Sequence, residues 1–309
     1  MSSPATHRST HHEDKTLDAF ACSTEQLAQL HHAQTWQDLA PGLHVHDPAF
    51  WHSKAGPLAL DAATLEDWQD LVIHEGYFHA PPPDWQLPIP DMAYLVHTLR
   101  QLQLPPVFAL VYDEFWLLFL KMAPVLAHLL GDDYAMLPNL WVWHVDPAAA
   151  ESGWLPHRDI GRAALYEDGR PKAMTVWLPL TEATPSNGCM YLVPADRDPT
   201  YNTPDEMNLR FQLPDIRALP AVAGSMLAWT QAVLHWGARA APRHLQPRIS
   251  IGAEFQRGDI PAFSQPLLNP GAMPGFEQRL QIIAQQIRRY KHHHAGDKTL
   301  AFLASHFLP

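Results

Sequence analysis

The stretch GWLPHRD at residues 153–159 decides the fold that we expect for this chain, because it places His157 two positions before Asp159. On a β-strand, residues two positions apart point to the same side. The imidazole and the carboxylate can therefore converge on one metal ion, provided that this part of the chain is built from strands. The sequence on either side of the stretch supports that condition.

Short apolar runs, separated by Pro, Gly, Asn and Asp, surround the His-x-Asp pair. Many short strands with turn residues between them indicate a β-sandwich or a barrel. We therefore predict a jelly-roll, cupin-like double-stranded β-helix as the core, over about 134–256. The runs that we expect to form its strands are residues 135–145, 174–180, 190–193, 217–222, 226–229, 232–236 and 248–255.

Helical patterns flank this β core on both sides. Apolar residues recur at helical spacing in a region over about 19–133 and again in a C-terminal tail over about 257–309. We expect a single domain over 19–309, and we expect the polar, His-rich residues 1–18 to be disordered. The predicted helices are residues 24–36, 63–77 (with Thr64 as a possible cap), 91–102, 113–130 and 275–290.

A third metal ligand is available in His235, within the stretch AVLHWG at residues 232–237. Two imidazoles and one carboxylate on one face of an ion leave its opposite face open, which is the arrangement of non-haem Fe(II) oxygenases. An isolated His-x-Asp is a weak signal in a chain with 20 histidines: HVD at 144–146 is a second copy of it, and HVHD at 44–47 is a similar cluster of His and Asp. For any one of these histidines, the alternative is a surface or hydrogen-bonded core imidazole.

Arg248, in PRIS at residues 247–250, follows His235 at a distance that lets a returning antiparallel strand bring it back beside the metal. A guanidinium presents a planar fork that suits a carboxylate. 2-Oxoglutarate chelates a metal through its 2-oxo acid group and has a second, distal carboxylate. We therefore predict that Arg248 binds this cosubstrate.

Residues from about 153 to 255 resemble the phytanoyl-CoA dioxygenase family in the order and spacing of their motifs. The matching segments are PHRD at 156–159, TVWLPLTEATPSNGCM at 175–190, VP at 193–194, AGS at 223–225, HWG at 235–237 and PR at 247–248. The resemblance implies a dioxygenase that uses Fe(II), 2-oxoglutarate and O2, forms succinate and CO2, and hydroxylates a small-molecule substrate. It also implies that Trp177 contacts the cosubstrate, with core packing as the alternative.

Two departures from the family pattern stand out. The VP turn usually continues as Gly-Ser-His in the family, whereas this chain has ADR at 195–197. Many members carry Ser or Thr two positions after the second His, whereas this chain has Gly237. Asp159 is retained, although related halogenases replace this carboxylate by a small residue. The resemblance therefore implies hydroxylation or a related oxidation.

Four further residues near the motif have two interpretations each. Arg158 and Arg162 flank the metal motif and are candidates for binding an anionic substrate, with solvated loop charge as the alternative. Trp141 and Trp143 alternate along the predicted strand 135–145, so they either line the active-site cavity or pack in the core.

The composition narrows the class of partners. Lys plus Arg total 21 against 32 for Asp plus Glu, a net charge of −11, so the chain has no general attraction for nucleic acids or anionic membranes. Two cysteines, Cys22 and Cys189, are too few for a disulfide framework. We see no secretory signal or membrane span, which favours the cytoplasm. The sequence does not indicate an oligomeric state.

Two other interpretations stay open at this point. A cupin-like metalloenzyme that does not use 2-oxoglutarate would share both the fold and the metal ligands. A non-catalytic β-sandwich binding protein would share the fold alone.

Overall fold

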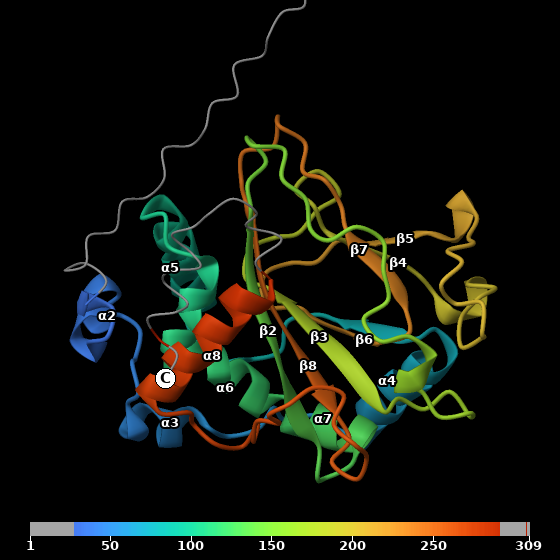
Figure 1. Cartoon of the computed structure of the whole chain (residues 1–309), viewed down its shortest axis with the longest axis horizontal. Coiled ribbons are helices and arrows are strands. Elements are labelled where there is room, and N and C mark those ends of the chain that lie inside the picture. Colours follow the sequence, from blue (N-terminus) through green and yellow to red (C-terminus); the bar gives the residue numbers. More distant parts are fainter. Residues whose placement is uncertain (1–27, 291–306, 308–309) are drawn as a thin grey trace, which may run out of the picture.

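Two antiparallel sheets form the core of this computed structural model, which describes residues 28–290 and 307. The larger sheet has the order β1-β6-β3-β8-β2, and the smaller one has the order β5-β4-β7 (Figure 1). This is the predicted double-stranded β-helix with helices around it. The strands are β1 Tyr77–Ala80, β2 Ala135–Val145, β3 Ala173–Pro179, β4 Met190–Val193, β5 Arg217–Leu219, β6 Met226–Thr230, β7 Leu234–Gly237 and β8 Arg248–Gln256.

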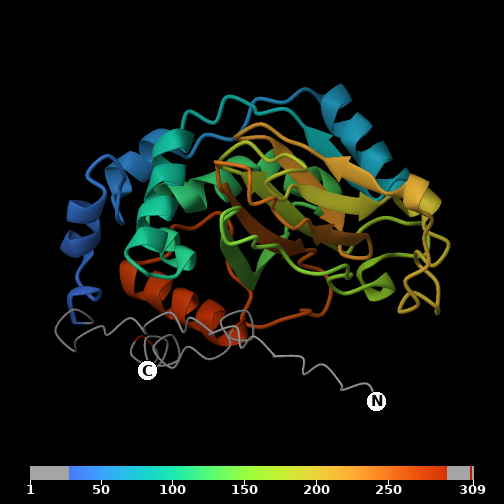
Figure 2. The same cartoon turned by 90° about the horizontal axis from the view of Figure 1, so that it is seen from above.

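The helices cover one face of the larger sheet. In Figure 1, α5, α6 and α8 lie to the left of this sheet and the smaller sheet lies to its right, and Figure 2 shows the same layers from above. The helices are α2 Ala33–Leu39, α3 Pro48–Lys54, α4 Ala62–His74, α5 Ile89–Gln101, α6 Asp113–Lys121, α7 Ala123–Leu130 and α8 Phe276–Arg289. None of the described helices combines the length and the apolar character that a membrane crossing needs.

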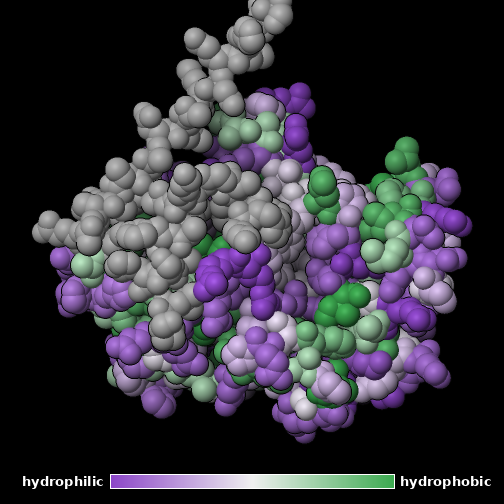
Figure 3. All heavy atoms as spheres, in the orientation of Figure 1, coloured by the Kyte–Doolittle hydropathy of each residue, from purple (hydrophilic) through white to green (hydrophobic). Residues whose placement is uncertain are grey.

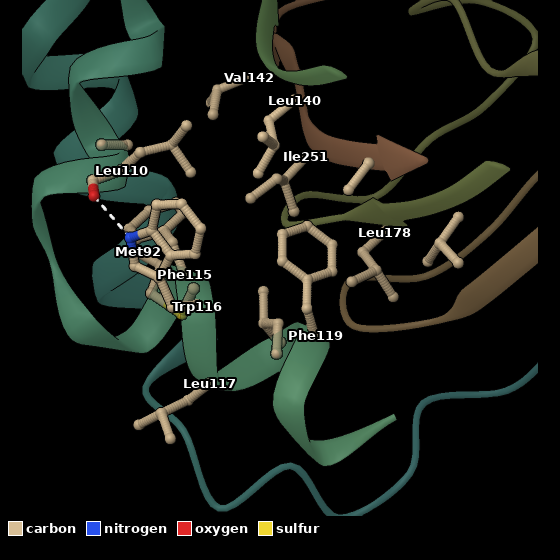
Figure 4. Packing of buried hydrophobic residues seen from close by; sticks show 14 of the residues in the cluster. Met92, Leu110, Phe115, Trp116, Leu117, Phe119, Leu140, Val142, Leu178 and Ile251 are labelled. Carbon is tan, nitrogen blue, oxygen red and sulfur yellow. Dashed lines mark hydrogen bonds between the residues drawn. The ribbon is translucent and has the colours of Figure 1, made fainter. Parts of the chain in front are cut away.

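Alternation along β8 separates the two faces of the large sheet. Ile249 and Ile251 belong to the buried apolar cluster under the helices. Figure 4 shows Phe115 and Phe119 of α6 pointing toward Ile251 and Leu140 across this layer. The residues of β8 between these apolar ones point the other way, toward the smaller sheet, because successive side chains of a strand alternate. The large sheet therefore has an apolar face for the helices and an inner face that is free to carry polar groups.

The predicted helix 113–130 is wrong as a single element, because it divides into α6 and α7 at Met122. Pro124 lies in the first turn of α7. Proline has no N–H to donate to the carbonyl four residues earlier, so it is tolerated at a helix start and interrupts a helix interior. Both halves are buried as predicted, and the division changes only their direction.

The N-terminal helical predictions are also adjusted. Within the described part of 24–36, the chain turns at residues 30–32, and α2 then begins at Ala33. The cap of α4 is Asp61, which accepts a 2.7 Å hydrogen bond from the Thr64 N–H, and not Thr64 itself. The expected disorder of residues 1–18 lies outside the described residues.

A strand lies inside the region that we predicted to be mainly helical. β1 follows α4 directly and pairs with β6, with Tyr77 opposite Trp229, so it forms one edge of the large sheet. Gly76 makes the turn between helix and strand, with φ +81°, and a Cβ there would lie 2.5 Å from Val233 Cγ2. Such a short strand acquires its structure from its partner, which local spacing cannot indicate.

Buried hydrogen bonds fasten α8 to the rest of the molecule. Arg279 forms a 2.6 Å ion pair with Asp113 and donates to the Val111 carbonyl at 2.7 Å. Gln286 accepts a 3.1 Å hydrogen bond from the Leu140 N–H, on the free edge of β2. These contacts hold the end of α8 beside the strand that precedes the His-x-Asp motif.

Candidate metal centre

A main-chain bridge brings His157 next to His235. Each residue donates its N–H to the carbonyl of the other, at 3.0 Å in both directions. His235 lies on β7, whereas His157 lies in the irregular segment between β2 and β3. The two imidazoles are 4.4 Å apart between ring centroids. An antiparallel pairing of residues far apart in the sequence therefore places both rings on one side of the chain.

The carboxylate of Asp159 lies between the two imidazoles. Its Oδ1 is 3.4 Å from His157 Nε2 and 3.6 Å from His235 Nε2. One ligand atom from each residue lies within 4.8 Å of the others, and this is the only group of three or more His, Cys, Asp or Glu side chains so placed among the described residues. The structure thus brings together the three predicted metal ligands.

Hydrogen bonds to the backbone orient both imidazoles. His157 Nδ1 lies 2.7 Å from the Leu155 carbonyl, and His235 Nδ1 lies 3.0 Å from the Val233 carbonyl. A carbonyl oxygen only accepts, so each Nδ1 carries the proton and donates it. The Nε2 lone pairs then face the carboxylate, as a metal ligand requires.

Thr175 holds the other oxygen of the carboxylate. Its Oγ1 donates a 2.6 Å hydrogen bond to Asp159 Oδ2, which leaves Oδ1 for a metal. Burial alone would raise the pKa of Asp159, but His235, His157 and Thr175 together lower it to about 2. Thr175 was not predicted as a site residue. It lies two positions before Trp177 on β3, so both side chains point to the same inner face of the sheet.

The pKa values of the two imidazoles shift in opposite directions. Burial lowers the pKa of His235 to about 4, although the charge of Asp159 opposes this. For His157 burial acts in the same direction, but the hydrogen bond and charge of Asp159 outweigh it and raise the pKa. His235 is therefore neutral near pH 7 and available as a ligand. A metal ion at His157 Nε2 competes with protonation of that atom, which the Asp159 carboxylate favours.

Arg248 is buried on the inner face of β8, at 1% exposure. Its Nε donates to the Gly188 carbonyl at 3.0 Å and its Nη1 to Ser250 Oγ at 2.7 Å. No carboxylate of the described residues forms an ion pair with it, and burial lowers its pKa to about 10. A buried cation with a free Nη2 edge and no counter-ion fits an anionic ligand.

A small cavity connects Arg248 to the metal ligands. Its lining includes Arg248, His157, His235 and five tryptophans, Trp141, Trp143, Trp154, Trp177 and Trp229. The Arg248 guanidinium lies over the Trp177 ring, 5.6 Å from its centroid. Trp177, Trp141 and Trp143 therefore line the cavity beside the two imidazoles, and a contact of Trp177 with the cosubstrate stays a prediction.

Glycines explain one departure from the family pattern. A Cβ on Gly237 would lie 2.7 Å from the Gly153 Cα and 3.4 Å from Arg248 Nη2. The backbones of these two glycines pack against each other beside the guanidinium. A Ser or Thr at position 237 therefore has no room, because the segment that leads into the His-x-Asp motif occupies that space.

The two similar motifs, HVD at 144–146 and HVHD at 44–47, have structural roles instead. His144 Nε2 lies 3.0 Å from His97 Nδ1, on the face of β2 that meets α5. His44 pairs with Glu114 at 2.7 Å, and Asp47 caps α3 by accepting from two backbone N–H groups. Neither motif belongs to a three-ligand group among the residues that the structure describes.

Arg158 does not face a substrate site. It lies between the two ligands of the motif and points away from the metal, with its side chain 4% exposed. Nη2 donates to Asp198 Oδ2 at 2.7 Å and to Thr200 Oγ1 at 3.0 Å, and Nη1 donates to the Ala232 carbonyl at 2.6 Å. These bonds fix the motif to the segment before β7 and to the loop after β4. The suggestion that Arg158 binds an anionic substrate is therefore wrong.

The loop that Arg158 binds has an apolar outer surface. Met207 and Leu213 are 84% and 81% exposed, and Figure 3 shows apolar side chains over this loop at the right of the molecule.

Arg162 meets the same loop only through its backbone N–H, which donates to Glu206 Oε2. Its guanidinium forms no ion pair within the described part of the chain, so an anion contact there stays a prediction.

Residues 96–244 match the phytanoyl-CoA dioxygenase (PhyH) family. That range includes the three metal candidates and ends before Arg248. No curated protein matches the chain.

Solved structures with a similar fold include the following three proteins. The α-ketoglutarate-dependent epimerase SnoN from nogalamycin biosynthesis is 21% identical, covers 70% of this chain and 95% of its own, and has a TM-score of 0.47. The non-haem monooxygenase ThoJ, as a nickel complex, is 16% identical, with coverages of 74% and 98% and a TM-score of 0.49. HygX from Streptomyces hygroscopicus, with nickel and 2-oxoglutarate bound, is 14% identical, with coverages of 65% and 88% and a TM-score of 0.45.

The double-stranded β-helix with two imidazoles and a carboxylate on its inner face defines the class of cupin-like, non-haem metal proteins. Within that class, the motif order and the family match identify the chain more closely. Residues 96–244, just under half of the chain, match the model of the phytanoyl-CoA dioxygenase family, whose members are non-haem enzymes dependent on Fe(II), 2-oxoglutarate and O2.

Proposed function

We propose that this protein is an Fe(II)/2-oxoglutarate-dependent dioxygenase that hydroxylates a small molecule, with His157, Asp159 and His235 as the iron ligands and Arg248 as the residue that binds 2-oxoglutarate. The observation that carries the proposal is the convergence of two Nε2 atoms on one carboxylate oxygen, at 3.4 and 3.6 Å. The donor set of two imidazoles and one carboxylate is the one that suits non-haem iron.

The surroundings of Arg248 support the cosubstrate assignment. Among the described residues the guanidinium is buried without a carboxylate partner, and it lies in the same cavity as both histidines. A dicarboxylate that reaches from the metal to Arg248 would neutralise this charge. Trp177, under the guanidinium, is proposed to pack against the same ligand.

Each residue then has a defined task. When bound, Fe(II) with 2-oxoglutarate and O2 supplies oxidative C–H chemistry and yields succinate and CO2. His157, Asp159 and His235 hold one side of the metal and leave the other side open. Thr175 fixes the carboxylate, and the tryptophans around the cavity exclude water from it.

The retained carboxylate supports hydroxylation or a related oxidation. Asp159 Oδ1 occupies the position between the imidazoles that a halide would need in a halogenating enzyme. The cytoplasmic location and the single domain over 19–309 are part of this proposal as well.

An anaerobic titration with Fe(II) and then 2-oxoglutarate tests the proposal. We expect a visible charge-transfer band when the keto acid chelates the metal, and we expect Asp159→Ala to abolish substrate-dependent turnover. Arg248→Ala should weaken 2-oxoglutarate binding by about 100-fold, the loss of a charge-assisted pair, with little change in iron binding. Equal loss of both would indicate misfolding.

Two outcomes would contradict the proposal. Iron binding without a keto-acid band and without 2-oxoglutarate consumption would favour a cupin-like metalloenzyme that does not use 2-oxoglutarate. Absence of metal binding would favour a non-catalytic β-sandwich protein.

A further inference from the structure

The inner face of β8 carries a second buried charge besides Arg248. Side chains alternate along this strand, and those that point toward the smaller sheet belong to Arg248, Ser250, Gly252, Glu254 and Gln256. Glu254 is only 7% exposed and takes part in no ion pair within the described part of the chain. The same face of the strand therefore presents a cation without an anion toward one end and an anion without a cation toward the other.

Glu254 lies next to the metal ligands. It is directly opposite Thr175 on β3, and the Cβ atoms of two residues that face each other in this way are about 5 Å apart. Thr175 in turn donates to Asp159 at 2.6 Å. Glu254 itself is not part of the three-ligand group found among the described residues. A molecule bound at Glu254 is therefore held beside the metal, on the same inner face, without displacing a ligand.

Two amide oxygens near this carboxylate have no hydrogen-bond donor. Asn139 Nδ2 donates to Glu254 Oε2 at 2.5 Å, and Gln231 Nε2 donates to Thr175 Oγ1 at 3.5 Å. The other atoms of these amides, Asn139 Oδ1 and Gln231 Oε1, are buried and unpartnered within the residues that the structure describes. Gln231 is fully buried, whereas Asn139 is half-buried, which places the group at the edge of the interior. Buried acceptors of this kind call for donors.

The positive charge nearest to this group is engaged elsewhere. Arg289 lowers the pKa of Glu254, but its guanidinium donates to the Pro138 carbonyl at 3.3 Å and to Ser264 Oγ at 3.1 Å. Burial and the charge of Asp159 outweigh this effect and raise the pKa of Glu254. A carboxylate in this position is therefore stabilised by any cation that reaches it.

We propose that Glu254, together with Asn139 Oδ1 and Gln231 Oε1, binds a protonated amino group of the substrate. The inference rests on the oxygenase function proposed above and names the substrate class of that site, a small cationic amine. An ammonium group has three N–H donors and one positive charge, which matches in number one carboxylate and two carbonyl oxygens. A hydroxyl group supplies a single donor and no charge. The net charge of −11 also favours the approach of cations to the molecule.

The two charges on β8 then separate the two organic molecules that the reaction needs. 2-Oxoglutarate is an anion and is attracted to Arg248, whereas the negative charges of Glu254 and Asp159 repel it from the other end of the face. An ammonium group has the opposite preference. Cosubstrate and substrate are thereby directed to different sides of the metal, and anionic substrates are excluded.

Three probes of one shape test the substrate class. Cyclohexylamine, cyclohexanol and cyclohexanecarboxylate share a ring and are respectively cationic, neutral and anionic near neutral pH. Their binding to the anaerobic protein with Fe(II) and 2-oxoglutarate is measured by equilibrium dialysis. We expect the amine to bind at least about tenfold more tightly than the alcohol, because hydrogen bonds to a charged group are the stronger ones, and we expect the carboxylate to bind most weakly. Equal binding of amine and alcohol, or no binding of the amine, would overturn the proposal.

Variants show whether Glu254 is the residue that binds the amine. Glu254→Gln removes the charge and keeps the shape, so it should weaken cyclohexylamine by about tenfold or more and leave cyclohexanol unchanged. Glu277→Gln, at an exposed position of α8, alters the net charge equally and should leave both unchanged. An amine that coordinated the metal instead would bind Glu254→Gln as tightly as the wild type, and that result would overturn the proposal.

Asn139→Ala is a second variant, which keeps Glu254 and serves if Glu254→Gln folds poorly. It removes one of the two unpartnered oxygens and should weaken cyclohexylamine by about threefold or more, the loss of one hydrogen bond, with cyclohexanol less affected. A merely structural role of the Asn139 contact would lower the free energy of unfolding and leave the preference for amine over alcohol as it is. That preference, unchanged in Asn139→Ala, would contradict the proposed group.

The keto-acid band separates this inference from the proposed function. We expect Glu254→Gln to retain the band at saturating Fe(II), because Glu254 does not line the cavity that contains Arg248. A wild-type protein without the band, but with amine binding that Glu254→Gln removes, would contradict the oxygenase function while the amine site stands. A band without any preference for the amine would contradict the amine site alone.

Discussion

Thr175 donates a 2.6 Å hydrogen bond to Asp159, and this contact ties the carboxylate of the metal motif to strand β3. Thr175 is fully buried and lies opposite Glu254 on β8, in the middle of the large sheet. Asp159 lies in an irregular segment, and its carboxylate is thus oriented by a residue of the regular strand β3. Metal sites commonly rely on such supporting hydrogen bonds.

Thr175→Val should weaken Fe(II) binding by about 10- to 100-fold, because it removes this hydrogen bond and keeps the side-chain shape. Fe(II) affinity is measured by anaerobic titration, with Thr175→Ser as the matched control that keeps the hydroxyl. Equal affinities of the Val and Ser variants would show that the contact does not support the ligand.

Arg158→Leu should destabilise the fold by about 3–5 kcal/mol, because it leaves Asp198 buried without its partner. Chemical denaturation measures the free energy of unfolding. Replacing both residues by Leu should recover part of the loss, since no unpaired charge is then buried. The coupling would be contradicted if the free-energy losses of Arg158→Leu and Asp198→Leu simply add in the double variant.

Gly237→Ala should weaken 2-oxoglutarate binding, because its Cβ would lie 2.7 Å from the Gly153 Cα and crowd Arg248 Nη2. We expect a loss of about tenfold or more for a displacement of this kind near the ligand. Gly56→Ala is the control, since nothing lies within 4 Å of a Cβ there. The intensity of the keto-acid band against 2-oxoglutarate concentration gives the measurement, and coincident curves for both variants would refute the expectation.

His144 should make stability fall on acidification. Burial, with the charges of His97 and Arg100, lowers its pKa from 6.5 to about 4, so the unfolded chain binds more protons than the folded one between these values. The contribution is present above about pH 6.5 and is lost as the pH falls toward 4, by on the order of 3 kcal/mol. His144→Phe should flatten the curve of unfolding free energy against pH in this window, whereas the exposed His32→Phe should not. Parallel curves for wild type and His144→Phe would contradict the assignment.

Local sequence determined the elements that are long or strongly patterned. The bounds of β2 and β4 are those predicted, and α8 differs from its prediction by one residue at each end. The break at Pro124 could have been anticipated from the proline rule. β1 was not anticipated from local pattern, because the predicted helix 63–77 runs into its first residue and the state of the strand depends on pairing with β6.

For the site, the sequence determined which groups can bind a metal. A His-x-Asp pair on extended chain faces one side, and the motifs downstream of it supplied His235 and Arg248 in the expected order. The downstream motifs singled out His157 among the three similar motifs, and the main-chain bridge between His157 and His235 is the contact that brings its ring to the third ligand. Tertiary structure alone decided that Arg158 is a buried structural link and that Thr175 supports Asp159. These roles depend on contacts between residues distant in the sequence and on burial, and neither quantity is a property of local spacing.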